Sequence, residues 1–132
     1  MADSQGDALH VELVAADRTV WSGGATMVIA RTVEGDVGVL KDHAPLLSLL
    51  TDAVVEISAE EGDLVVAAVD GGFLSVANNR VSILSERAIL AADIDVSAAQ
   101  SELESARTSD EDDAEARIRR AEVRIRAAER SS

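Results

Sequence analysis

Asp42 and His43 are neighbours and hold two of the side-chain types that most often act as general acid and base. On a strand, consecutive side chains point to opposite faces, so this carboxylate and this imidazole would not naturally hydrogen-bond. No Gly-x-Ser-x-Gly or comparable nucleophile setting accompanies them. A small hydrolase that uses His43 with Asp36 or Asp70 is therefore the weakest functional hypothesis, and we expect no catalytic residue.

The sequence also gives little support for a metal-binding or phosphate-binding site. The chain contains no cysteine, and its only histidines are His10 and His43, without a His-x-x-x-His or calcium-loop spacing. The segment from Gly35 to Lys41 has glycines and a lysine, but it lacks the phosphate-loop spacing and no Ser or Thr follows the lysine. We expect no metal site.

Charge argues against two further classes of partner. The chain carries 25 acidic and 12 basic residues, a formal net charge of −13. Nucleic acids and anionic lipid surfaces both attract basic proteins, so we expect no nucleic-acid partner and no direct insertion into a bilayer. No apolar stretch approaches the length of a membrane span, and residues 1–7 lack the basic start and apolar run of a secretory signal. The expectation is a soluble, cytoplasmic protein.

Residues 1–92 are predicted to form an N-terminal antiparallel β-sandwich. Apolar and polar residues alternate from Leu9 to Leu13 and from Ala53 to Ile57, as in strands with one buried face. Asn78-Asn79 tolerates positive φ and is expected to form a tight hairpin turn. Further strands are expected at residues 25–32, 64–69, 73–76 and 81–84, with Gly71-Gly72 as a break between two of them. Short strands with frequent turns and no helices between them are typical of a sandwich.

Residues 93–132 are predicted to form a C-terminal antiparallel hairpin of two helices, so the fold class is mainly β plus α. Apolar residues recur at spacings of three and four, which places them on one stripe of each helix. The stripes are Val96, Ala99, Leu103 and Ala106, then Ile118, Ala121, Ile125 and Ala128. Asp95 or Ser97 is expected to cap the first helix. Because both stripes are narrow and alanine-rich, we expect a marginally stable, mobile regulatory domain.

The second predicted helix is rich in arginine, with six arginines between residues 117 and 130. One interpretation is a solvated helix face with pairs such as Glu115–Arg119 and Glu122–Arg126. The other is a basic helix that docks onto the acidic surface of a partner. The sequence alone leaves both open.

The segment from Gly35 to Leu47 is the most informative part of the chain. It combines two glycines, one of the two histidines and the only proline, without any catalytic or metal-binding spacing. This combination favours a shaped surface for a protein partner. Its leucine-rich end, residues 44–50, fits either a buried strand or an exposed patch. A second segment, Val69–Val76, also has a glycine break followed by an apolar run.

Together these segments resemble the epsilon subunit of bacterial F-type ATP synthase. The sequences that carry the resemblance are Val20-Trp21-Ser22-Gly23, Glu34–Leu40, Asp42–Leu47, Val69–Val76 and Asn79–Leu84, in the family's order. The resemblance implies a non-catalytic rotor subunit of the central stalk, peripheral at the cytoplasmic face of the bacterial cell membrane. Such a subunit binds the gamma subunit and the c-ring and couples proton flow to ATP synthesis. In many bacteria its hairpin extends and inhibits ATP hydrolysis.

The resemblance also implies roles for particular residues. Asp36 matches an acidic position that meets the c-ring. The loop near the stalk interface is matched by Lys41, Asp42, His43, Ala44, Pro45, Leu46 and Leu47, where Lys41-Asp42 replaces the family's usual Pro-Gly. The positions that meet the alpha and beta subunits transiently, when the hairpin extends, are matched by Arg117, Arg120, Arg124 and Arg126.

Some members of this family bind ATP through an Ile/Leu-Asp-x-x-Arg-Ala motif in the second helix. Arg120-Ala121 fits the end of the motif, but Ala116 and Arg117 occupy its first two positions. The loss of the acidic residue argues against ATP binding, and we expect no cofactor. The alternative hypothesis is a free-standing nucleotide-sensing module whose hairpin closes over an edge of the sandwich.

Overall fold

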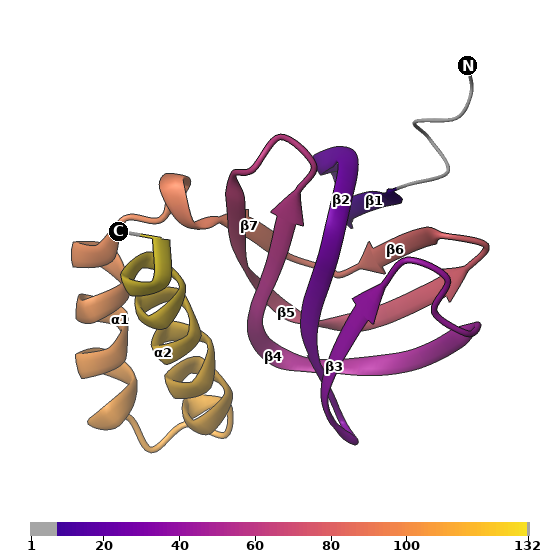
Figure 1. The fold of residues 1–132 in the computed structure, drawn as a ribbon. Coiled ribbons are helices and arrows are strands. Elements are labelled where there is room, and N and C mark those ends of the chain that lie inside the picture. The colour runs from indigo at the N-terminus through magenta and orange to yellow at the C-terminus, as the bar shows by residue number, and fades with distance from the viewer. Residues whose placement is uncertain (1–7, 132) are drawn as a thin grey trace.

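Residues 8–131, which the computed structural model describes, form seven strands, a short 3₁₀ helix and two α-helices (Figure 1). The strands are β1 (Leu9–Ala15), β2 (Arg18–Thr32), β3 (Gly35–Leu40), β4 (Leu46–Ala59), β5 (Leu64–Ala77), β6 (Arg80–Leu84) and β7 (Ala88–Leu90). The helices are η2 (Ala91–Asp93), α1 (Val96–Arg107) and α2 (Ala114–Ser131). None of the helices in this part of the chain has both the length and the apolar character to cross a bilayer.

The strands form one sheet that curls back on itself, with β3 left at an edge and β7 paired to β5. Its order is β1-β6-β5-β4-β2-β3, and β1 also pairs with β2, which closes the ring. The predicted fold class, a β-sandwich followed by a helical hairpin, is confirmed. One detail differs from a purely antiparallel sandwich, because β1 and β6 run parallel. Sequence periodicity indicates strands but not which distant strands become neighbours, and these two lie about seventy residues apart.

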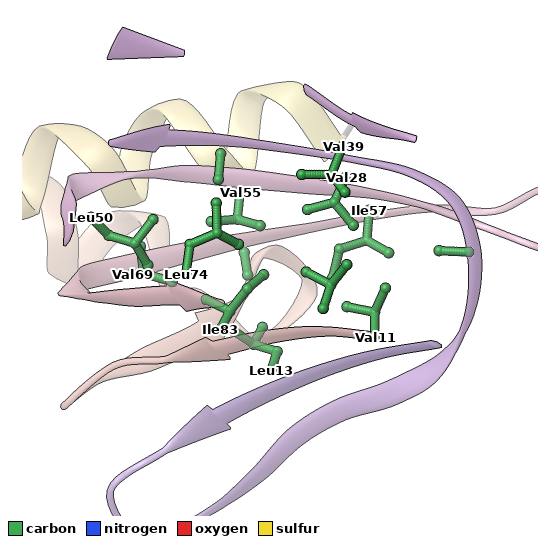
Figure 2. Close-up of a cluster of buried hydrophobic side chains, with 14 of the residues drawn as sticks. Val11, Leu13, Val28, Val39, Leu50, Val55, Ile57, Val69, Leu74 and Ile83 are labelled. Atoms are coloured by element: carbon green, nitrogen blue, oxygen red, sulfur yellow. The ribbon is translucent and has the colours of Figure 1, made fainter. Parts of the chain in front are cut away.

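The core fills the inside of the curled sheet with aliphatic side chains (Figure 2). Alternation along β1 points Leu9, Val11 and Leu13 inward, where all three are fully buried. They meet Val28 from β2 and Ile57 from β4. Branched aliphatic residues suit a pleated surface and pack densely without aromatic rings, which explains how a chain with 2% aromatic residues builds this core.

The glycine pair Gly71-Gly72 bends β5 without ending it. The sequence predicted two strands separated by these glycines, but β5 runs continuously from Leu64 to Ala77. Both glycines have positive φ, 68° and 118°, a conformation that side chains other than glycine rarely adopt. The bend gives the two halves of β5 different neighbours, since residues 67–69 pair with β7 and residues 73–77 pair with β6.

The predicted turn at Asn78-Asn79 is confirmed. Both asparagines have positive φ, 52° and 63°, and they join β5 to β6. Of the two proposed caps of the first helix, Asp95 is the one used, because its Oδ1 accepts a hydrogen bond from the backbone N–H of Ala98 at 3.0 Å.

Helix α2 lies between α1 and the outer face of the sheet (Figure 1). Of the predicted stripe on α2, Ala121 is buried, and Ile118, Ile125 and Ala128 are half-buried. The other buried residues of α2 are Val123 and Ala127, which form a second core with Val66 and Ala68 of β5. A helix that contacts two neighbours has two buried faces, so a single-stripe pattern does not describe it. The expected domain boundary at residue 92 falls inside η2.

Candidate protein-interaction site

The loop between β3 and β4, residues 41–45, is pinned to the turn between β5 and β6. The backbone N–H of Asp42 donates to Oδ1 of Asn79 at 2.6 Å, and Nδ2 of Asn79 donates to Oδ1 of Asp42 at 3.1 Å. Asp42 has a φ of 67°, a left-handed conformation that aspartate adopts more readily than most residues other than glycine. The two reciprocal hydrogen bonds therefore join the loop to the turn between β5 and β6.

The hydrogen bonds of His43 are made to neighbouring residues of its own chain segment. Its Nδ1 lies 2.7 Å from the carbonyl oxygen of Ala44, so this nitrogen donates, and its backbone N–H donates to the carbonyl of Leu40 at 3.1 Å. The carboxylate of Asp42 contacts Asn79 and not the imidazole. These contacts give His43 the role of shaping the loop that leads into β4.

An apolar band crosses the outside of the sheet next to this loop. Leu49, Phe73 and Leu84 are direct partners on β4, β5 and β6, and all three are exposed. Leu47 lies two residues before Leu49 on the same face and is 73% exposed. Val33, also exposed, joins them because its backbone N–H donates to the carbonyl of Leu49 at 3.0 Å. Large exposed side chains gathered in this way mark an interaction surface.

The apolar band extends the site beyond the residues that the sequence indicated. Of the predicted residues, Leu46 is partly buried against the core, while Leu47 belongs to the exposed band. The leucine-rich segment is therefore a buried strand in one part and an exposed patch in another. Val33, Phe73 and Leu84 were missed. The sequence does hold a signal for Phe73, because two large apolar neighbours such as Phe73-Leu74 cannot both face one core.

Asp36 does not join the loop and the band. It pairs with Arg31 on β2, with 2.9 Å between Oδ1 and Nε and 3.4 Å between Oδ2 and Nη2. Asp36 is near the start of β3 and the loop begins only after Leu40, about 13 Å farther along the strand. Asp36 lines the cleft between the sheet and α2 instead. The predicted interface residues therefore fall into two groups at opposite ends of β3.

The arginines of α2 pair between elements and not along the helix. Arg119 lies 3.5 Å from Asp52, and Glu122 lies 3.7 Å from Arg107 of α1, in place of the two predicted pairs along the helix. Three of the four predicted regulatory arginines also pair with residues of other elements, and the fourth is exposed. Arg117 bonds Glu102 of α1, Arg120 and Arg124 reach Asp70 of β5, and Arg126 is exposed in the cleft beside β2 and β4.

Arg31 holds the pKa of the Asp36 carboxyl below its usual range, first through the hydrogen bond and then through its charge. A carboxyl with a lowered folded-state pKa adds stability above its unfolded pKa and loses it as the pH falls through the folded value. We expect Arg31→Gln to raise the pKa of Asp36 in a carboxyl NMR titration, with only a small change in stability because the pair is exposed. Arg18→Gln is the control, and an unchanged pKa for Asp36 in Arg31→Gln would contradict the pairing.

A profile of the ATP synthase delta/epsilon chain, beta-sandwich domain, matches residues 8–91. The chain belongs to this ATP synthase delta/epsilon family. Within it, the ATP synthase epsilon chain of Streptomyces avermitilis is 59% identical over 80 residues, which are 61% of this chain and 64% of the relative. That of Corynebacterium diphtheriae is 54% identical over 82 residues, which are 61% of this chain and 67% of the relative. The match thus spans slightly less than two thirds of the Streptomyces relative.

Chains in two solved structures share the fold of this chain over more than nine tenths of its length. A chain of the Euglena gracilis mitochondrial ATP synthase, OSCP/F1/c-ring, superposes with a TM-score of 0.71 at 24% identity, covering 93% of this chain and 78% of that chain. A chain of the Tetrahymena thermophila mitochondrial ATP synthase central stalk/c-ring gives a TM-score of 0.61 at 16% identity, covering 94% and 96%. At these identities the likeness concerns the fold.

Proposed function

We propose that this chain is the non-catalytic epsilon subunit of the central stalk in a bacterial F-type ATP synthase, where it helps couple c-ring rotation to ATP synthesis. The observation that carries the proposal is the exposed apolar band beside the pinned loop, on a sandwich whose bacterial relatives are named ATP synthase epsilon chain. Subunits of a permanent assembly bury such surfaces against one another.

The gamma subunit is the proposed partner of the band. Val33, Leu47, Leu49, Phe73 and Leu84 offer a broad apolar surface that an apolar helical face of gamma would cover. The loop from Lys41 to Pro45 borders this surface and adds polar and charged groups to its rim. Through these contacts the chain is held peripherally at the cytoplasmic face of the cell membrane, without entering the bilayer.

The proposed contact with the c-ring is made by Asp36, and the proposed contact with the alpha and beta subunits is made by the arginines of α2. Asp36, with Arg31, presents a paired charge at the opposite end of β3, suited to the polar loops of a c-ring. Arg117, Arg119 and Arg124 of α2 are paired within this chain in the docked hairpin. Contact with acidic surface on alpha and beta, and with it inhibition of hydrolysis, requires that those pairs break.

The test is co-purification of the tagged full chain from its native membranes. Recovery of the gamma subunit and the c-ring is the expected result. Recovery of the chain alone, from membranes that retain an intact synthase, would overturn the proposal.

A nucleotide-sensing module remains the second candidate because of one observation. A cleft of about 350 Å³ between β7, α1 and α2 is lined by Arg87, Arg117, Arg120 and Arg124, which suit a polyphosphate, although Asp95 and Glu102 line it as well. For the stalk subunit we expect no ATP-dependent shift in melting temperature. A rise in melting temperature that increases with ATP concentration would favour the sensor.

A further inference from the structure

Two carboxylates face each other across the sheet beneath α2. Asp52 of β4 and Asp70 of β5 are direct cross-strand partners, and their side chains are only 12% and 5% exposed. Like charges directly opposite on neighbouring strands repel each other. A carboxylate with so little access to water is costly unless a cation or hydrogen-bond donors compensate it. With α2 docked over them, these two carboxylates therefore need a cation, and without α2 the sandwich keeps their mutual repulsion.

Helix α2 supplies the compensating charge. Nη2 of Arg124 lies 2.9 Å from Oδ2 of Asp70, and Nε of Arg120 lies 4.0 Å from the same oxygen and 3.8 Å from Oδ2 of Asp52. Arg119 approaches Asp52 at 3.5 Å. Arg124 is also oriented by its own helix, because its Nη1 donates to the carbonyl of Arg120 at 3.1 Å. The arrangement places an oriented guanidinium group against the more deeply buried carboxylate.

The compensation of Asp70 is incomplete. Its Oδ1 is buried and has no hydrogen-bond partner among residues 8–131, so Oδ2 receives the only ion pairs of this side chain in that range. The buried part of the apolar contact that accompanies the pair is made by Val and Ala side chains, Val123 and Ala127 against Val66 and Ala68, and Val54, Ile89 and Ile94 pack against them only partly buried. Small side chains bury little area, so the charged contact weighs heavily in holding the hairpin in place.

We propose that Asp52 and Asp70 form a guanidinium-binding site built into the sheet, whose occupant is the arginine face of α2. The site sets the docked position of the hairpin by charge, and it makes the sandwich less stable whenever the hairpin leaves. Arginine fits better than lysine, because its planar group presents several donors to two adjacent carboxylates. The inference is independent of the proposed stalk function, since it concerns the isolated chain.

The test is amide hydrogen exchange on the full chain with three single variants. Arg124→Gln leaves Asp70 charged and paired only with the more distant Arg120, so we expect exchange about tenfold faster in α2 and also faster exchange in the central residues of β4 and β5. Asp70→Asn removes the attraction and the repulsion together, so α2 should exchange faster while β4 and β5 do not. Arg126→Gln makes the same charge change on an exposed arginine of the same helix and should leave both regions as they are.

A double variant makes the test decisive. If the site acts through the pair, Asp70→Asn/Arg124→Gln should exchange like Asp70→Asn alone, because the second change removes a partner that is already lost. Effects that multiply, or an Arg124→Gln protein that matches Arg126→Gln, would overturn the proposal. If Arg124→Gln does not fold, Arg120→Gln gives the same comparison with a smaller effect, because Arg120 lies farther from Asp70.

Discussion

Replacing Gly72 with alanine is expected to lower the free energy of unfolding by about 3 to 5 kcal/mol. The residue has a φ of 118°, which costs an alanine conformational strain. An added Cβ would also overlap the carbonyl oxygen of Leu84 and lie 2.9 Å from Cα of Ser85. These are backbone atoms of the neighbouring chain segment, so no side-chain rotation relieves the clash. The bend that lets β5 serve two neighbours would have to move.

Urea unfolding followed by the fluorescence of Trp21, the only tryptophan, measures this loss. Gly38→Ala is the matched control, because a Cβ at Gly38 meets nothing within 4 Å. We expect that variant to stay within about 0.5 kcal/mol of the wild type. A Gly72→Ala protein as stable as the control would show that the glycine is not required by the bend.

Placing a charge in the apolar band is expected to abolish assembly with the proposed stalk partner. Phe73→Asp and Leu49→Asp each put a carboxylate into the surface that gamma would desolvate, and Phe73 lies in the middle of the cross-strand row. Central apolar anchors typically contribute about 2 kcal/mol or more, which corresponds to at least about a thirtyfold weaker Kd. Both side chains are exposed in the free chain, so folding should be retained.

Binding of each variant to purified gamma subunit, measured by titration calorimetry, tests this expectation. Leu64→Asp is the control, because Leu64 is as exposed as Leu49 but lies at the opposite end of β5. Unchanged affinity for Phe73→Asp and Leu49→Asp would remove the apolar band from the interface. An equal loss for Leu64→Asp would point to net charge as the cause.

Local signals in the sequence determined much of the architecture. Alternation of apolar residues identified β1 and the buried half of β4, and the Asn78-Asn79 turn followed from the ability of asparagine to adopt positive φ. The cap at Asp95 was equally local. Each of these features depends on residues within a few positions of one another, so a linear sequence carries it. The family resemblance rested on segments of the same kind.

Only the tertiary structure decided how these elements meet. The parallel pairing of β1 with β6, the alignment of Leu49, Phe73 and Leu84 in one exposed row, and the separation of Asp36 from the loop all depend on which strands are neighbours and in what register. The carboxylates with which the arginines of α2 pair also depend on which elements become neighbours in the folded chain. A guanidinium group pairs with the carboxylates that folding brings within reach, and for Arg124 this is Asp70, 54 residues earlier in the chain. Charge in a sequence indicates that pairs will form, but long-range packing selects them.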